Sequence, residues 1–211
     1  DDTFRYQLQF DSWGDCLTAR DFLAKKSGKA PGAVDAPYLF VPDLAHQYLL
    51  STGTTLFKGL DFTSLRCLAL DIETFCAEGY EFSNPERPED RIISIALKDS
   101  HGDETLLRGD VLSEPELLRA LTETIHRCDP DVIIGHNIFR FDLDYIGRRA
   151  RLHGIVLDWG RNGAPPHITP SSRWSLAEKV IDYPRWDVYG RHIIDTYFLV
   201  QLYDIGLRSL E

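Results

Sequence analysis

Two acidic residues, Asp71 and Glu73, stand at the end of a nearly continuous apolar run that starts near Arg66. In a β-strand, residues two apart project from the same face, so both carboxylates would leave the strand end together. Two neighbouring anions are costly unless a cation lies between them. The pair therefore suits a divalent-metal site, although an acidic strand end facing solvent explains it equally well. Alone, D-x-E does not decide between these interpretations.

A second group of polar residues follows another short apolar run. Residues 133–142, I-I-G-H-N-I-F-R-F-D, pass through a tight turn at Gly135 and place Asn137 and Asp142 at the start of a predicted helix. Each residue has a structural explanation, Asn137 as a helix cap and Asp142 as an anion beside the positive end of the helix dipole. The complete string G-H-N-x-x-x-F-D behind an apolar strand is far more specific than its parts.

Together, the two strings resemble exonuclease motifs of the DEDD superfamily, in the version found in the proofreading domains of family B DNA polymerases. Asp71-Ile72-Glu73-Thr74 resembles the first motif and residues 135–142 resemble the second. Residues 190–196, G-R-H-I-I-D-T, resemble the segment that follows in those domains. The resemblance covers residues 65–211, and the intervals between the motifs agree with it.

This resemblance implies a metal-dependent chemistry. Asp71, Glu73 and Asp142 would hold two Mg²⁺ or Mn²⁺ ions, one activating water for attack on the terminal phosphodiester and one stabilising the departing 3′ oxygen. Oxygen ligands suit such metals, and the sequence has no cysteine cluster to compete.

The same resemblance assigns substrate contacts. Thr74 and Asn137 would contact the 3′-terminal nucleotide, and Phe141 would pack beside it. For Phe141, a core aromatic is an equally good explanation.

The family also has a third motif, a Tyr or His with an Asp four residues later on the last helix. Tyr183 and Asp187 have this spacing, but Pro184 opposes a helix and the string precedes Asp195, whereas the family places the motif after it. We therefore expect a chain truncated before this motif and inactive or weakly active by itself, and the absence of methionine also indicates a fragment. For Asp195, a helix cap is favoured over a metal ligand.

The elements that position these residues predict an α/β fold, a ribonuclease H-like mixed five-stranded sheet flanked by helices. A capping box at Ser113 and Glu116 begins one helix, and others are predicted at 141–152 and 195–203. Residues 158–186 are predicted to be irregular. The expected strands are 66–72, 91–98, 104–107, 131–135 and 192–194.

Residues 1–64 are predicted to form a small N-terminal extension without visible chemistry. Alternating apolar residues predict a strand at 4–10, a loop follows at 24–37, and a second strand is expected at 38–41. Residues 43–50 are ambiguous between helix and strand.

Composition limits the function classes. The net charge of −10 argues against a protein that coats nucleic acid nonspecifically, but not against an enzyme whose acidic residues recruit metals. No apolar run approaches the roughly 18 residues that span a membrane. The four cysteines form no C-x-x-C pair, which favours reduced thiols in a cytoplasmic protein.

The leading hypothesis is a 3′→5′ exonuclease that shortens single-stranded DNA, either alone or as a proofreading module attached to a polymerase domain or subunit. A degenerate exonuclease fold that binds nucleic acid or has a structural role is the alternative outside enzymes. A 3′→5′ exoribonuclease is the alternative within them. Intact Asp71, Glu73 and Asp142 count against degeneration, because a binding module need not keep clustered anions opposite phosphate.

Overall fold

The computed structural model describes residues 4–55, 58–176 and 179–208. The chain divides into two compact units, residues 1–60 and residues 61–211. Each unit is described by itself below.

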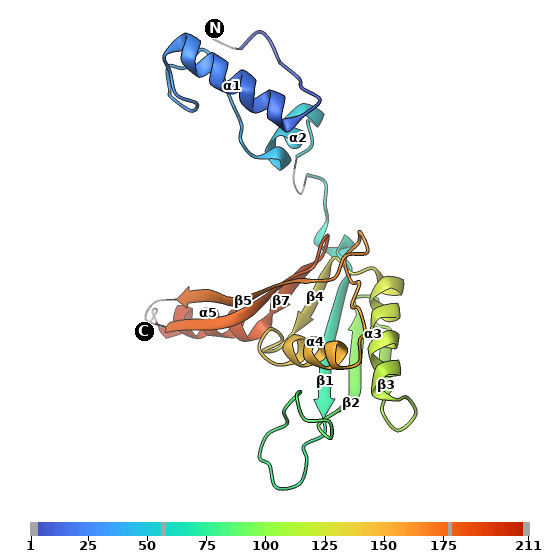
Figure 1. The fold of residues 1–211 in the computed structure, drawn as a ribbon. Coiled ribbons are helices and arrows are strands. Elements are labelled where there is room, and N and C mark those ends of the chain that lie inside the picture. Colours follow the sequence, from blue (N-terminus) through green and yellow to red (C-terminus); the bar gives the residue numbers. More distant parts are fainter. Residues whose placement is uncertain (1–3, 56–57, 177–178, 209–211) are drawn as a thin grey trace. The chain divides into compact units, whose positions relative to one another are not determined.

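A mixed five-stranded sheet with the strand order β3-β2-β1-β4-β7 forms the centre of the larger unit (Figure 1). β1 (Cys67–Thr74) pairs antiparallel with β2 (Ile92–Asp99), which pairs antiparallel with β3 (Glu104–Arg108). On its other side β1 runs parallel to β4 (Val132–Gly135), and β4 runs parallel to β7 (His192–Asp195). The predicted ribonuclease H-like α/β fold is confirmed.

One face of this sheet forms the core together with α3 (Glu114–Cys128) and α4 (Asp142–Leu152). The predicted capping box is present at the start of α3, where Glu116 Oε2 accepts a hydrogen bond from the Ser113 backbone N–H at 2.7 Å. A further helix, α5 (Thr196–Arg208), follows β7. The core takes every second residue of β1 and the apolar sides of the two helices: Leu68, Leu70, Ile72, Leu117, Leu118, Leu121, Ile125, Leu143 and Ile146.

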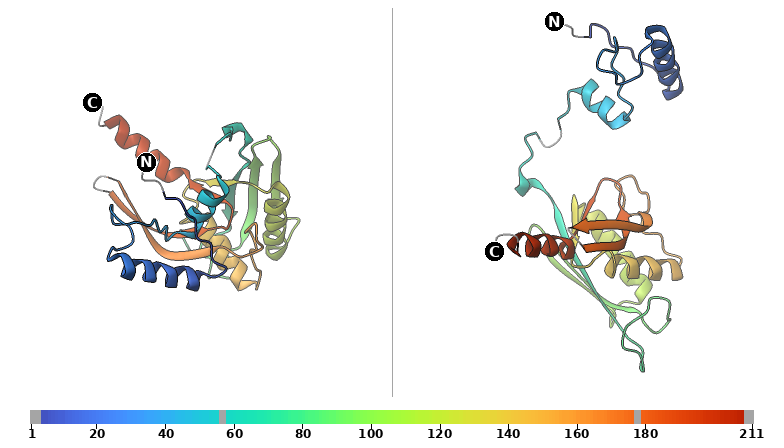
Figure 2. Two further views of the ribbon diagram at one scale, coloured as in Figure 1. Left: turned by 90° about the horizontal axis from the view of Figure 1, so that it is seen from above. Right: turned by 90° about the vertical axis from the view of Figure 1, so that its left-hand side faces the viewer.

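The prediction of an irregular segment at 158–186 is wrong from His167 onward. β5 (His167–Leu176) and β6 (Lys179–Asp187) pair antiparallel as a separate two-stranded sheet, shown in Figure 2. Pro170 and Pro184 argue against strands in the sequence, because proline donates no hydrogen bond to a neighbouring strand. A two-stranded ribbon tolerates them at its outer edges, and the register is interrupted between Thr169 and Ser172.

The N-terminal unit also differs from expectation, because residues 4–10 and 38–41 do not form strands. α1 (Trp13–Ser27) occupies part of the expected loop, with Ser12 as its N-cap and Gly28 ending it at φ 68°. The ambiguous segment is helical, as α2 (Leu44–Thr52). Apolar alternation predicts which face of a strand would be buried, but a strand also needs a neighbour to satisfy its backbone.

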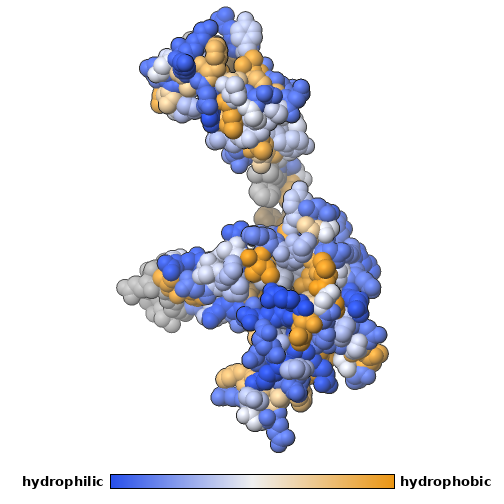
Figure 3. Space-filling model, in the orientation of Figure 1, coloured by the Kyte–Doolittle hydropathy of each residue, from blue (hydrophilic) through white to orange (hydrophobic). Residues whose placement is uncertain are grey.

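Apolar side chains remain at the surface of this N-terminal unit, several of them visible in Figure 3. Neither α1 nor α2 contains a buried residue. The exposed apolar residues include Phe4, Tyr6, Leu8, Phe22, Leu44, Tyr48 and Leu50. No helix in the described part of the chain is long and apolar enough to cross a membrane.

A buried ion pair joins the two core helices to the loop between β1 and β2. The Arg149 side chain in α4 is 2% exposed and donates to Glu114 Oε1 at 2.8 Å and Oε2 at 2.5 Å. Arg149 also donates to the loop carbonyls of Pro85 and Arg87, at 3.1 and 2.8 Å. Burial alone would raise the pKa of Glu114, but hydrogen bonds from Arg149, the Ile92 N–H and His153 outweigh it and lower that pKa.

Removing the Arg149 guanidinium should leave the Glu114 carboxylate buried without its ion-pair partner, and the loop carbonyls without a hydrogen-bond donor. We expect Arg149→Ala to lower the free energy of unfolding by about 3 to 5 kcal/mol. The neighbouring Arg148 pairs with Asp144 and Glu86 at the surface, so Arg148→Ala should cost less than about 1 kcal/mol. Urea unfolding followed by tryptophan fluorescence measures both, and equal losses in the two variants would contradict the assignment.

Candidate active site

The two carboxylates of the first motif lie on the open face of the sheet. Asp71 and Glu73 are both exposed, whereas Ile72 between them points into the core. Across the ladder, Asp71 lies opposite Ala96 and Glu73 lies opposite Ser94. The strand therefore projects both carboxylates to the same side, as its period of two predicts.

The second motif begins where β4 ends in a turn with strict steric requirements. A Cβ at Gly135 would lie 2.7 Å from Ile138 Cδ1, so only glycine fits there. Asn137 has φ 56°, a left-handed conformation that asparagine tolerates better than most residues. The Phe141 N–H donates to the Asn137 carbonyl at 3.0 Å, and α4 starts at the next residue, Asp142.

Asp142 connects the second motif to the first through the backbone of β1. Its Oδ1 accepts a hydrogen bond from the Ile72 N–H at 3.0 Å, and the residue is 2% exposed. Burial raises the pKa of Asp142 to about 7, helped by the negative charges of Asp71 and Asp195 and opposed by the Ile72 hydrogen bond. A buried carboxyl with a raised pKa beside two other acidic residues is a candidate functional group.

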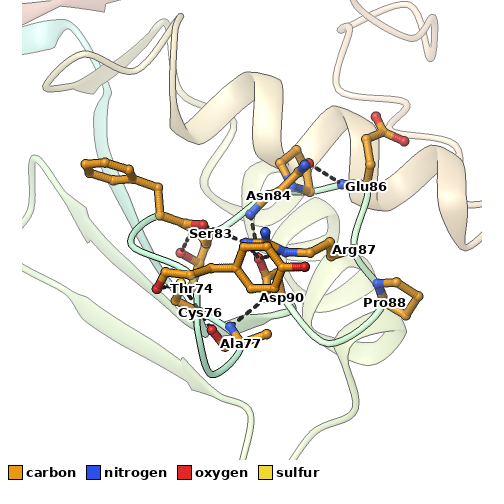
Figure 4. Close-up of polar contacts among 12 residues, drawn as sticks. Thr74, Cys76, Ala77, Ser83, Asn84, Glu86, Arg87, Pro88 and Asp90 are labelled. Atoms are coloured by element: carbon orange, nitrogen blue, oxygen red, sulfur yellow. Dashed lines mark hydrogen bonds and ion pairs between the residues drawn. The ribbon is translucent and has the colours of Figure 1, made fainter.

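The predicted substrate-contacting residues lie at the end of β1 and in the turn before α4. Thr74 is half-buried at the end of β1, and its hydroxyl lies 2.8 Å from the Ser83 hydroxyl (Figure 4). Asn137 is half-buried in the turn. Phe141 is 38% exposed, with its ring centroid 5.7 Å from that of Tyr145, so it is a surface aromatic rather than a core one.

Asp195 acts as the helix cap that the sequence favours. It is buried at the end of β7, and its Oδ1 accepts a hydrogen bond from the Tyr197 N–H at 2.9 Å in the first turn of α5. The same oxygen accepts from the Asn137 N–H at 2.8 Å, so the residue also holds the second-motif turn.

Comparison with known proteins identifies the family. The sequence-family model for the exonuclease domain of family B DNA polymerases matches residues 53–202. This chain belongs to that family.

Archaeal DNA polymerases are similar to most of this exonuclease domain. The DNA polymerase of Pyrococcus glycovorans is 30% identical over 204 residues, which cover 93% of this chain and 24% of that protein. DNA polymerase 1 of Pyrococcus abyssi is 32% identical over 86% of this chain and 24% of its own length. The chain thus spans about a quarter of these relatives.

A solved structure agrees in both sequence and fold. The family B DNA polymerase from Pyrobaculum calidifontis is 31% identical, with a TM-score of 0.52 over 65% of this chain and 16% of that chain. These findings confirm the resemblance predicted from the motifs.

The Tyr183 and Asp187 pair is not the third motif of this exonuclease domain. Both residues lie on β6 and not on a helix. The Tyr183 ring packs against Phe139 and Phe198, with centroids 5.2 and 4.9 Å away, and Asp187 pairs with Arg185. The expectation that this segment, with Pro184 inside it, does not form a helix is confirmed.

No sequence pattern indicates how the loop between β1 and β2 is held beside the site (Figure 4). Asp90 is fully buried and accepts from the Ala77 N–H at 2.8 Å, the Asn84 N–H at 2.6 Å and Arg87 Nε at 2.7 Å. The Arg87 guanidinium lies 3.6 Å from the centre of the Tyr80 ring. The polar composition of this segment predicts only a loop, because these contacts depend on its folded shape.

The donor set fits a hard divalent cation chemically. Asp71, Glu73 and Asp142 supply only carboxylate oxygens, which Mg²⁺ and Mn²⁺ prefer. In the part of the chain that the structure describes, no three His, Cys, Asp or Glu residues converge closely enough to hold a metal. Asp142 is buried at the edge of the core, while the other two carboxylates lie on the open sheet face.

Asp142 should make the stability of the metal-free domain depend on pH. Its folded-state pKa of about 7 exceeds the ordinary 3.8, so its protonated form stabilises the fold fully below pH 4 and this contribution is lost as pH rises through 7. The amide introduced by Asp142→Asn would keep an acceptor for the Ile72 N–H without titrating. We expect this variant to gain stability over the wild type between pH 5 and 8, on the order of 2 to 4 kcal/mol at pH 8. Thermal unfolding in EDTA across this range measures the difference, and a difference independent of pH would refute the assignment.

Proposed function

We propose that this chain is a proofreading 3′→5′ exonuclease module that removes nucleotides from the 3′ end of single-stranded DNA. The observation that carries the proposal is the hydrogen bond from the Ile72 N–H to Asp142, because it ties the second motif to the strand between Asp71 and Glu73. Family membership supplies the class of reaction, since the matched domain is an exonuclease domain.

The carboxylates account for the metal requirement in this proposal. Asp71, Glu73 and Asp142 would hold Mg²⁺ or Mn²⁺, which lowers the pKa of a bound water and stabilises negative charge on a phosphodiester. Without a cation, burial raises the pKa of Asp142 and favours its protonated form, helped by the charges of Asp71 and Asp195. With a cation bound, the same carboxyl would lose its proton and become a ligand of that cation.

The loop that follows β1 supports a single-stranded substrate. Phe75, Tyr80 and Phe82 in this loop are all exposed, and Ser83 is joined to Thr74 at the end of the strand. Exposed aromatic rings stack on unpaired bases, whose faces are covered by neighbouring base pairs in a duplex. Arg91 lies over the Phe75 ring at 5.7 Å and adds positive charge beside the acidic strand end.

The relatives support an association with a polymerase. The similar archaeal proteins are DNA polymerases of which this chain covers about a quarter. We propose that the module works with a polymerase domain or subunit, which would deliver mispaired 3′ ends to it. Intact acidic motifs weigh against a degenerate binding module.

The direct test is shortening of labelled single strands by the natural protein that contains this sequence. With Mg²⁺ or Mn²⁺, a 5′-labelled DNA strand should give a ladder of shorter products, and Asp71→Ala should slow it by more than about a hundredfold, because one metal-ligating carboxylate is lost. Glu104→Gln is the matched control, because Glu104 is an exposed acid on the sheet that pairs with Lys98 away from the site.

Three results would count against this assignment. Undiminished shortening by Asp71→Ala would exclude the proposed metal site. Release of the 5′ label before any shorter labelled product forms would reverse the polarity. Faster shortening of an RNA strand of the same sequence would change the substrate to RNA.

The aromatic loop makes a separate prediction about binding. Phe82 is 75% exposed beside the Ser83 contact to Thr74, whereas Phe62 is 88% exposed in the turn before β1. We expect Phe82→Ala to weaken binding of single-stranded DNA by about 1 to 3 kcal/mol, and Phe62→Ala to leave it unchanged. Fluorescence anisotropy of a labelled oligonucleotide in EDTA measures both affinities without cleavage. Equal losses from the two substitutions would show that the loop is not the stacking surface.

A further inference from the structure

A buried carboxylate at the end of β7 binds the turn of the second motif, residues 136–141 between β4 and α4. Asp195 is 4% exposed and lies opposite Gly135 in the parallel ladder between β4 and β7. Its Oδ1 accepts from the Asn137 N–H at 2.8 Å, and its Oδ2 accepts from the Phe139 N–H at 3.4 Å. Two backbone donors of a turn that belongs to no strand or helix are thereby satisfied from the neighbouring strand.

The next residue adds a second connection to the same turn. The Thr196 hydroxyl donates to the Gly135 carbonyl at 3.1 Å and lies 3.0 Å from His136 Nδ1. Because the single hydroxyl hydrogen goes to the carbonyl, His136 Nδ1 must donate to the hydroxyl oxygen. Asp195 and Thr196 together therefore contact Gly135, His136, Asn137 and Phe139.

These contacts bear directly on where Asp142 lies. Asn137 adopts φ 56°, which costs an L-residue energy unless local contacts compensate, and the Asp195 carboxylate binds the N–H of that same residue. The turn then passes without a break into α4, since the Leu143 N–H donates to the Ile138 carbonyl at 2.9 Å. A shift of the turn would move the start of α4, and with it Asp142, away from the Ile72 N–H.

We propose that Asp195 is a positioning residue of the metal site, acting through the turn rather than as a ligand. This inference rests on the proposed function, because it assumes that Asp71, Glu73 and Asp142 hold the cation. Both oxygens of Asp195 face backbone N–H groups, and the side chain is buried beneath the turn. Its contribution is hydrogen-bond acceptance, which an amide oxygen can largely replace, and not charge.

That distinction sets the experiment, which measures Mn²⁺ binding to the 211-residue chain by calorimetry. Asp195→Ala removes every acceptor and should weaken Mn²⁺ binding about 10- to 100-fold, the range found when partners that orient metal ligands are lost. Asp195→Asn keeps one oxygen for the Asn137 and Tyr197 N–H groups and should lose less than about tenfold. Equal large losses in both variants would show that the charge of Asp195 binds the metal, and unchanged affinity in Asp195→Ala would remove its role altogether.

Asp131→Asn is the matched control at the other end of β4. The Asp131 carboxylate also accepts a backbone hydrogen bond from a neighbouring segment, from the Arg66 N–H at 2.9 Å, and the residue directly precedes a core strand. Its substitution should alter thermal stability without changing Mn²⁺ affinity. A loss of affinity as large as that of Asp195→Ala would reduce the effect to general destabilisation and overturn the proposal.

A metal-free measurement separates this inference from the proposed function. In amide NMR spectra recorded in EDTA, Asp195→Ala should shift the Asn137, Phe139 and Ile72 N–H signals. Asp195→Asn should shift the Asn137 and Phe139 signals, whose acceptor changes, and leave the Ile72 signal close to its wild-type position, while Asp131→Asn leaves all three in place. A wild-type chain that binds no Mn²⁺ would refute the metal site, yet these signals would still report whether Asp195 sets the turn and the Asp142 contact. An unmoved Ile72 signal in Asp195→Ala would overturn the positioning role. If Asp195→Ala does not fold, unmoved Asn137 and Phe139 signals in Asp195→Asn would overturn it.

Discussion

The hydrogen bond from the Ile72 N–H to Asp142 is the contact on which the site depends. It joins a residue at the start of α4 to the backbone of β1 at the point where the strand projects Asp71 and Glu73 to its open face. The two atoms lie 3.0 Å apart, although their residues are separated by 70 positions in the chain. The parallel pairing of β1 with β4 places the turn that follows β4 beside β1. The sheet topology therefore serves the placement of one carboxylate.

Electrostatics explains how an acidic chain can act on an acidic polymer. The net charge of −10 repels a phosphate backbone at long range, and the carboxylates at the site repel one another at short range. In the proposed function, divalent cations would relieve both effects, because they would balance the site and present positive charge to a phosphate. Arg87 and Arg91 act differently, because each lies over an aromatic ring of the loop beside the site. Charge and stacking surface are thus combined where a single strand would lie.

Local patterns predict most of the larger unit and the main candidates of its site. Sequence alone identifies the features whose pattern occupies only a few consecutive residues. They are the apolar run ending in Asp71 and Glu73, the capping box at Ser113 and the turn at Gly135. The hairpin of β5 and β6 escapes such patterns because Pro184 lies inside it. At residues 4–10 the opposite error arises, since alternation predicts a strand whose backbone partner the pattern cannot supply.

Long-range polar contacts are the part that no local pattern reveals, and they share a common task. Arg149 with Glu114 holds the loop after β1 from one side, and Asp195 holds the turn after β4 from the other. Burying such groups costs free energy that an apolar core would avoid, unless every donor and acceptor is paired. Here they fix irregular backbone, which lacks ladder or helix hydrogen bonds of its own. These contacts therefore fix the two backbone segments that flank Asp71 and Asp142. Small displacements of either segment would separate the carboxylates of the proposed metal site.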